Sequence, residues 1–259
     1  MACVFMQSLS VVIICKNEAE IISGTLNSLP GLTDDIVVFD NGSTDVTIEK
    51  IKQFNVQLHQ GNWEGFGKTK NKANALAKYD WILSLDADET IDDELKSSLL
   101  QLDLSDDQYI YEIRFKNFLG NKWLRFGEWG NDKHIRLFNR TKVQWNVSEV
   151  HELLIFPKGV KKILLPGYVL HKTAVNFEEY EVKMKNYAYL NAKKYFRLNK
   201  KAGGLRIFLS PAFSFIKNYI FKLGFLDGSA GFTCARINAS YTFLKYKKLN
   251  ELNMINRSE

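Results

Sequence analysis

The hydrophobic pattern of the N-terminal third of the chain alternates between two periods. Short apolar runs, typical of buried parallel strands, occur at residues 9–15, 35–40 and 81–85, and residues 55–59 predict a further short strand. Between them, apolar residues recur at helical spacing within 21–29 and at Ile48 and Ile51, and a Lys-rich helix is expected at about 67–79. Strands and helices that alternate in this way form βαβ units with right-handed crossovers. The pattern predicts an α/β fold with a mostly parallel central sheet flanked by helices.

The pattern changes beyond the fourth predicted strand. Residues 109–115 alternate between apolar and polar, which predicts an edge or antiparallel strand. Strand-like runs at 134–138 and 164–170 follow, and residues 177–198 have helical periodicity. Residues 204–226 are strongly apolar but contain Arg, Pro and Lys. We therefore expect a helical extension at the C-terminal end of the α/β part.

The charge is distributed unevenly along a chain of ordinary globular composition. Residues 1–150 contain 16 Lys+Arg against 22 Asp+Glu, a net charge of −6, whereas residues 151–259 contain 19 against 7, a net charge of +12. A basic C-terminal part is typical of a protein that meets a membrane surface, a nucleic acid or a phosphorylated glycan, but a solvated surface has the same composition.

Cysteine content and the absence of targeting signals favour a cytoplasmic protein. Cys3, Cys15 and Cys234 are scattered and odd in number, which argues against a disulfide framework or a zinc site. We recognise neither a signal peptide nor an uncharged apolar run of the ~18–20 residues that span a membrane.

Acidic or polar clusters directly follow three of the predicted parallel strands, at residues 16–18, 40–45 and 86–88. The carboxyl ends of parallel strands meet at one edge of a sheet, where ligands bind. Asp86 and Asp88 are one residue apart and would repel each other without a cation, and carboxylate oxygens suit Mg²⁺ or Mn²⁺. The alternative is that Asp88 or Asp92 caps a helix that begins near residue 91.

Four segments carry a resemblance to a known family: VVIICKNEAEII, IVVFDNGSTDVTIEK, GKTKNKANALA and WILSLDADE. Together, over residues 9–95, they resemble the family 2 inverting glycosyltransferases of the GT-A fold. Later segments, including GEWGNDKHIRLFNR, VQWNVSEVHELL and GYVLHKTAVNFEEY, are most similar to β-glycosyltransferases of lipopolysaccharide core biosynthesis. The resemblance implies a catalytic domain over 1–175, with nucleotide-sugar binding at about 9–95 and acceptor binding at about 96–175, and a basic, partly amphipathic helical region over 176–259.

The resemblance also implies roles for individual residues. The implied donor-binding residues are Asn17, Glu18, Asp40, Asn41, Gly42, Asp45, Lys70, Asp86 and Ala87. The implied ligands of a Mn²⁺ or Mg²⁺ cofactor are Asp86 and Asp88, and His171 is a further candidate ligand. Simpler interpretations exist for three of these: Asp45 as a helix N-cap, Lys70 as a solvent-exposed charge and His171 as a structural residue.

An inverting transfer needs a base that accepts the proton of the attacking hydroxyl group. Glu152 occupies the position at which the family places its catalytic acid, and His151 beside it would orient the acceptor or the carboxylate. Asp132 is the second candidate base. In many relatives a Glu-Asp pair stands where this chain has His151-Glu152, and an ion pair with a nearby cation is the structural alternative for Glu152.

The apolar segment at 212–226 separates into two faces if it is helical. Ser214, Lys217, Asn218 and Lys222 fall on one side, and Phe213, Ile216, Tyr219, Ile220 and Leu223 cover most of the other. Such a helix lies in the plane of an anionic membrane or packs on the catalytic domain. The sequence leaves both possibilities open.

The expected function is metal-dependent transfer of a sugar from a nucleoside-diphosphate donor, with UDP as the expected nucleotide. The expected acceptor is a lipid-linked saccharide such as the lipopolysaccharide core, reached from the cytoplasm or at the inner face of the cytoplasmic membrane. A polyprenyl-phosphate sugar synthase of the same fold is the nearest alternative. A non-catalytic protein that binds nucleic acid or a membrane surface belongs to another class, and for the transferase no nucleic-acid partner is expected.

Overall fold

The computed structural model describes residues 7–146 and 153–258. The chain forms two compact units. The first, here called the sheet unit, comprises Met1–Phe115 and Lys133–His171. The second, the helical unit, comprises Lys116–Asp132 and Lys172–Glu259.

The sheet unit is built on one mixed sheet. Four strands are parallel, in the order β3 (Gln57–Gln60), β2 (Asp35–Asp40), β1 (Ser10–Cys15) and β4 (Trp81–Asp86). The order continues with β8, β6, β11 and β5, and β4 with β8, β8 with β6 and β11 with β5 pair antiparallel. These strands span Lys133–Asn139 for β8, Tyr109–Leu119 for β6, Lys161–Ala174 for β11 and Glu89–Ile91 for β5. The predicted α/β fold is thus confirmed, including the antiparallel strand that begins at residue 109.

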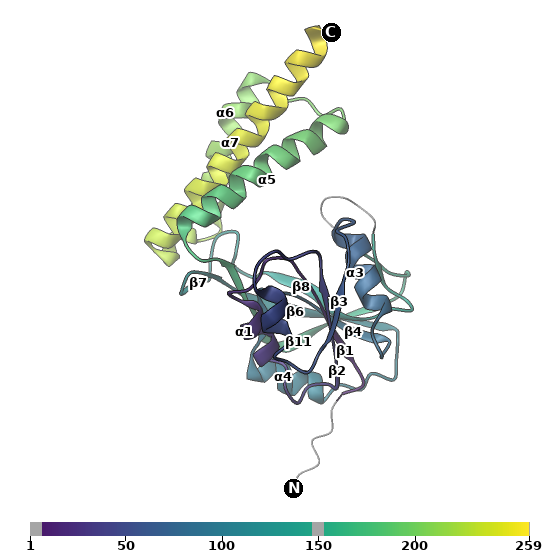
Figure 1. Ribbon diagram of the computed structural model, residues 1–259. Coiled ribbons are helices and arrows are strands. Elements are labelled where there is room, and N and C mark those ends of the chain that lie inside the picture. The colour runs from purple at the N-terminus through teal and green to yellow at the C-terminus, as the bar shows by residue number, and fades with distance from the viewer. Residues whose placement is uncertain (1–6, 147–152, 259) are drawn as a thin grey trace. The chain divides into compact units, whose positions relative to one another are not determined.

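Alternate residues of the strands point to opposite faces of the sheet, and different helices pack against the two faces (Figure 1). Val11 and Ile13 share one core with α1 (Ile22–Asn27) and α4 (Asp93–Leu100). Val12 and Ile14 share the other core with α3 (Phe66–Ala75). The short helix α2 spans Thr47–Ile51, and a two-stranded sheet pairs β9 (Gln144–Trp145) with β10 (Leu154–Ile155).

Asp92 begins α4 and also fixes its position against β11. Its carboxylate accepts hydrogen bonds from the backbone N–H groups of Leu95, at 2.9 Å, and Tyr168, at 3.0 Å. The backbone N–H of Asp92 donates to the carbonyl of Tyr168 at 3.1 Å. Of the two acids considered as helix caps from the sequence, Asp92 therefore takes that role.

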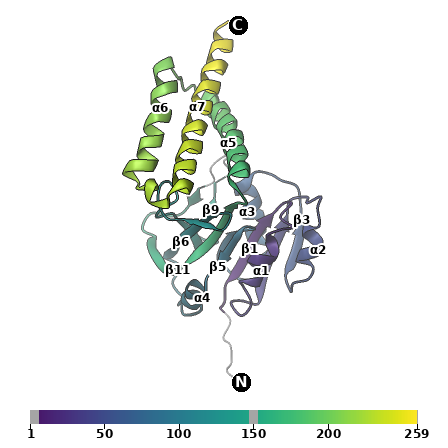
Figure 2. The ribbon, with the colours of Figure 1, turned by 90° about the vertical axis from the view of Figure 1, so that its left-hand side faces the viewer.

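The helical unit contains three long helices, α5 (Phe177–Arg197), α6 (Gly204–Ile216) and α7 (Ser229–Ser258). α5 and α6 lie on opposite sides of α7 (Figure 2). A π-helical turn, η1 (Lys217–Phe221), and a 3₁₀ turn, η2 (Gly224–Asp227), connect α6 to α7. A short strand, β7 (Lys122–Leu124), pairs with the end of β6. Among the described residues, no helix combines the length and apolar character that crossing a bilayer requires.

Gly167 allows β11 to pass close to the start of α4. Its φ of +87° lies in the left-handed region, and a Cβ at this position would lie 2.1 Å from the backbone nitrogen of Leu95. Backbone atoms cannot move aside as the end of a flexible side chain can. Gly159 has a similar φ of +96°, but a Cβ there would have no heavy atom within 4 Å.

The Gly167→Ala substitution should therefore destabilise the protein by ~3 kcal/mol or more, because backbone strain and a clash with α4 add together. Gly159→Ala, the matched control, should cost only ~1 kcal/mol from the left-handed φ. Urea denaturation of the two variants measures both values. Equal losses would show that close packing of β11 on α4 is not what requires glycine.

Candidate functional site

The carboxyl ends of β1, β2 and β4 are level with one another. Cys15, the last residue of β1, pairs with Asp40 of β2, and its neighbour Ile14 pairs with Asp86 of β4. The loops that follow these strands contain most of the residues selected from the sequence. The register therefore brings the three polar clusters to one edge of the parallel strands.

Asp40 is fully buried and organises the loop after β2. Its carboxylate accepts hydrogen bonds from the N–H groups of Gly42 and Ser43, both at 3.0 Å, and from the Ser43 hydroxyl. Gly42 has a φ of +82°. Asn41 donates from its side-chain amide to the carbonyl of Cys15 at 3.2 Å. Its buried Oδ1 has no hydrogen-bond partner in the described part of the chain, which is unusual for a buried polar atom.

Asn17 and Asp45 join the loops after β1 and β2. Asn17 has a φ of +56°, and its Oδ1 accepts a hydrogen bond from the N–H of Thr44 at 2.8 Å. Asp45 accepts hydrogen bonds from the N–H and hydroxyl of Thr47, which lower the pKa of its carboxyl group. The N–H of Glu18 donates to the hydroxyl of Thr47 at 2.8 Å. Asp45 precedes the N-cap residue of α2, which is Val46, and its other carboxylate oxygen accepts a hydrogen bond from the N–H of Ala19 at 3.4 Å. Asp45 therefore links the two loops and is not the N-cap of α2.

Two cations hold Asp86 at the end of β4. Lys70 of α3 is buried, with its Nζ 3.0 Å from Asp86 Oδ1 and 4.7 Å from the centre of the Trp145 ring. Arg136 of β8 donates to Asp86 Oδ2 at 3.1 Å and also contacts Glu89. The solvent-exposed interpretation of Lys70 is therefore wrong.

The cations determine how the two carboxylates ionise. Burial alone would raise the pKa of Asp86, but the positive charges of Lys70 and Arg136 outweigh it and hold that pKa well below its ordinary value. Burial raises the pKa of Glu89, and the charge of Arg136 offsets only part of that effect. Glu89 also accepts a hydrogen bond from the backbone N–H of Asp86 at 3.0 Å.

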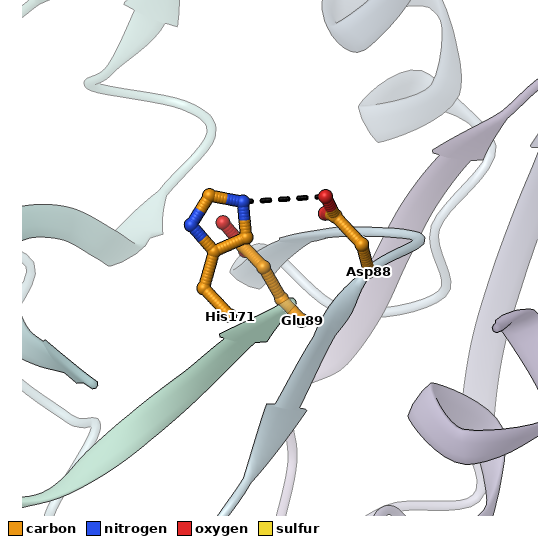
Figure 3. Close-up of side chains that lie close together, drawn as sticks. All are labelled: Asp88, Glu89 and His171. Carbon is orange, nitrogen blue, oxygen red and sulfur yellow. Dashed lines mark ion pairs between the residues drawn. The ribbon is translucent and has the colours of Figure 1, made fainter. Parts of the chain in front are cut away.

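Asp88, Glu89 and His171 form a group that could hold a metal ion (Figure 3). One donor atom from each lies within 4.8 Å of the others, and His171 Nε2 is 3.2 Å from Asp88 Oδ2. The group depends on the sheet, since His171 of β11 pairs directly with Glu89 of β5. Two carboxylates and an imidazole are suitable ligands for Mn²⁺ and acceptable ones for Mg²⁺.

Asp88 and Glu89 also influence the pKa of the His171 imidazole. Burial would lower its pKa, but its hydrogen bond to Asp88 and the negative charges of Asp88 and Glu89 raise the pKa above the ordinary value. A bound cation would need the neutral imidazole and would therefore compete with this proton.

The remaining predicted residues lie in different places. Ala87 is buried, and its carbonyl accepts a hydrogen bond from the Thr25 hydroxyl at 2.6 Å. Asp132 belongs to the helical unit, where it accepts a hydrogen bond from Asn117 at 2.9 Å. His151 and Glu152 lie outside the described residues.

Glu89 and Asn71 belong to this region of the structure but were not predicted from the sequence. Glu89 directly follows the Asp-x-Asp motif, but such an acid also suits the first turn of a helix, and only the pairing of β5 with β11 places it beside His171. The side chain of Asn71 exchanges two hydrogen bonds with the backbone of Trp145, at 2.8 and 2.9 Å. A single Asn in a Lys-rich helix gave no signal of this role.

Three kinds of comparison show which known proteins this chain is similar to. The profile described as "Glycosyl transferase family 2" matches residues 10–224. An uncharacterized glycosyltransferase of Rickettsia typhi is 30% identical over 98% of this chain and 90% of its own length. The lipopolysaccharide core biosynthesis glycosyltransferase LpsC of Rhizobium meliloti is 25% identical over 93% of this chain and 91% of its own length. The crystal structure of S. aureus TarS in complex with UDP is 16% identical with a TM-score of 0.45, covering 97% of this chain and 92% of that one.

Replacing Arg136 by Met should destabilise the protein by ~3–5 kcal/mol, because the buried Glu89 loses its cation, whereas the half-buried Asp86 keeps Lys70. Adding Glu89→Gln to that variant should restore part of the loss, on the order of 1–2 kcal/mol, since it removes the uncompensated carboxylate. Urea denaturation of the two single variants and the double variant gives the coupling energy. Lys142→Met, which removes an exposed ion pair with Asp107, is the control and should cost less than ~1 kcal/mol. Strictly additive losses for Arg136 and Glu89 would contradict the charge-compensation role.

Proposed function

Because the chain belongs to glycosyl transferase family 2, we propose that it transfers a sugar, with inversion, from a nucleoside-diphosphate donor to a lipid-linked saccharide in a metal-dependent reaction. The observation that carries this proposal is the group of Asp88, Glu89 and His171 beside the charge-compensated Asp86, at the edge where the parallel strands end.

The donor binds over the loops that follow β1 and β2. Six residues of these strand ends and loops line the site of the nucleobase and ribose: Asn17, Glu18, Asp40, Asn41, Gly42 and Asp45. The unpartnered Oδ1 of Asn41 supports this assignment, because a buried acceptor favours a ligand that donates a hydrogen bond. Lys70, Asp86 and Ala87 lie toward the diphosphate, for which Lys70 supplies positive charge. UDP is the nucleotide we propose.

The cofactor is Mn²⁺ or Mg²⁺, held by Asp88 and His171 with Glu89 or Asp86 completing the carboxylate ligands. When bound, the ion neutralises negative charge that develops on the departing diphosphate. The chain's own contribution is to keep several acids together at this edge. Arg136 and Lys70 do so by compensating the charge of Asp86 and Glu89.

The acceptor hydroxyl loses its proton to a carboxylate while its oxygen attacks the anomeric carbon. The bond from that carbon to the diphosphate oxygen breaks on the opposite side, and the configuration inverts. Glu152 is the proposed base with His151 as its orienting partner, and Asp132 is the second candidate. The domain boundaries expected from the sequence remain our proposal, with donor binding at about 9–95, acceptor binding at about 96–175 and the helical extension at 176–259.

The acceptor we propose is the lipopolysaccharide core, met from the cytoplasm at the inner face of the membrane. The similarity to LpsC supports this choice, since that protein is named for lipopolysaccharide core biosynthesis and the match covers nearly the whole chain. The test is incubation with UDP-, GDP-, CMP- and dTDP-sugars, Mn²⁺ and a soluble, delipidated core oligosaccharide, followed by NMR of the product. One donor should be consumed only with acceptor and metal, and the new linkage should have inverted configuration. A retained configuration, or transfer only to polyprenyl phosphate, would reject the proposal.

Metal binding can be measured without turnover. A nucleotide and Mn²⁺ at ~100 times their dissociation constant should stabilise the folded protein by ~2.7 kcal/mol in a thermal-shift experiment. Asp88→Asn and His171→Asn should each lose the Mn²⁺-dependent part of the shift. Asp103→Asn, which alters an exposed turn acid, should retain it. A full Mn²⁺ response in Asp88→Asn would place the metal elsewhere.

The proposed base is tested by isosteric amides. Glu152→Gln should lower kcat by ~10²–10⁴-fold, because the hydroxyl proton then has no acceptor, while the thermal shift with donor and Mn²⁺ stays unchanged. Asp132→Asn is the parallel variant. Full turnover in Glu152→Gln with loss in Asp132→Asn would transfer the role to Asp132.

A further inference from the structure

Helix α6 and the turn η1 leave most of their large apolar side chains exposed. The side chains that are buried or half-buried along them are Ile207, Ser210, Pro211, Ser214, Phe215, Asn218 and Tyr219. Spacings of three and four residues form one stripe along a helix. Three of its seven members are polar, and the buried residue of η1 is Asn218.

Most of the large apolar side chains of the same segment lie on the solvent side; Phe215 and Tyr219 instead pack against Phe232 of α7. Leu205 is 75% exposed, Phe208 70% and Phe213 61%. The exposed apolar residues of α6 and the turns that follow are Leu205, Phe208, Leu209, Phe213, Ile216, Ile220, Phe221, Leu223, Phe225 and Leu226. A helix on a globular protein normally buries its apolar face. A continuous exposed apolar surface therefore marks a site that a membrane or another molecule covers.

The charged residues of this segment are of one sign. Residues 200–226 contain five basic and no acidic residues, namely Lys200, Lys201, Arg206, Lys217 and Lys222. Lys201, Lys217 and Lys222 are exposed. A second copy of the chain would bring the same positive charge to the interface and be repelled. An anionic bilayer supplies both an apolar interior and negative headgroups.

The shape of the segment fits a surface that lies in the membrane plane. α6 has 13 residues, too few to cross a bilayer. The turns after it are held by the rest of the helical unit. Asp227 accepts hydrogen bonds from the backbone N–H groups of Arg125 and Phe126, and the N–H of Gly127 donates to the carbonyl of Lys222 at 2.9 Å. The exposed apolar side chains are therefore presented on a preformed support.

We propose that α6, η1 and η2 form a membrane-insertion surface that enters the headgroup–acyl boundary of an anionic bilayer, with Lys217 and Lys222 at the headgroups. This inference rests on the proposed function, because a lipid-linked acceptor is what brings the enzyme to a membrane. The binding itself needs neither donor nor acceptor.

The test is co-sedimentation of the full chain with vesicles of phosphatidylcholine alone and with 30% phosphatidylglycerol (a chosen composition in the usual anionic range). The wild type should bind the anionic vesicles at least about tenfold more tightly than the neutral ones. Phe208→Ser/Phe213→Ser should weaken binding to the anionic vesicles by about tenfold or more, because two inserting side chains are lost. Both positions are exposed, so the variant should keep the thermal midpoint of the wild type.

The matched control is Val182→Ser/Leu190→Ser on α5. Those side chains are 58% and 50% exposed, and α5 lies on the far side of α7 from α6 (Figure 2). The control should bind vesicles like the wild type. Equal binding by all three proteins would overturn the inference. A second result would also overturn the inference: the wild type binds no vesicles but self-associates as its concentration rises, and the Phe208→Ser/Phe213→Ser variant does not self-associate. A second copy of the chain would then cover the surface.

A second measurement separates this inference from the proposed reaction. Transfer to the soluble core oligosaccharide should be the same for the wild type and the Phe208→Ser/Phe213→Ser variant. If no donor is consumed but vesicle binding is lost in the variant, the membrane surface stands and the proposed reaction fails. If transfer is intact and the wild type ignores anionic vesicles, the reaction stands and the membrane surface fails.

Discussion

Charge compensation at Asp86 is the constraint on which the candidate site depends. A buried carboxylate without a partner is strongly unfavourable, and this edge of the sheet contains Asp86, Asp88 and Glu89 within four residues. Lys70 reaches Asp86 from α3, and Arg136 reaches both Asp86 and Glu89 from β8. A helix on the parallel side and a strand of the antiparallel part thus each contribute one cation. Both cations compensate the negative charge that these acids bring to one edge of the sheet.

The antiparallel part also positions the imidazole of the candidate metal group. β11 is fixed against the start of α4 by the hydrogen bonds between Asp92 and Tyr168 and by the close approach at Gly167. With that register, His171 pairs with Glu89. Contacts several residues away from the acids therefore determine which donor atoms meet. The site is a property of strand register as much as of the Asp-x-Asp motif.

The helical unit and the sheet unit differ in how completely they bury their apolar side chains. In the sheet unit, the apolar residues of β1, β2 and β4 are almost completely buried. In the helical unit, α6 buries Ile207 and packs Phe215 against Phe232 of α7, but it leaves most of its large apolar side chains exposed. An amphipathic pattern predicts two faces but not which face points inward. The burial of Ile207 and Asn218 settles that question for this segment.

The sequence could predict those residues of the site that directly follow a strand along the chain. Runs of apolar residues located β1, β2 and β4, and the acids that end them had to meet at one edge because parallel strands share a direction. Glu89, and the contact of Arg136 with it, could not be predicted in the same way. Their neighbours are far apart in the sequence, and no local period encodes the pairing of β5 with β11 or of β4 with β8.

The sequence by itself determined the α/β fold, the family and the position of the acidic cluster, because these depend on local periodicity and on contiguous motifs. Only the tertiary structure decided that Lys70 is buried on Asp86, that Asp45 contacts the loop after β1 and that His171 meets Asp88. It also decided that the apolar side of α6 faces outward. These outcomes depend on which surfaces pack together and on the free energy of burying charge, and both are properties of long-range contacts.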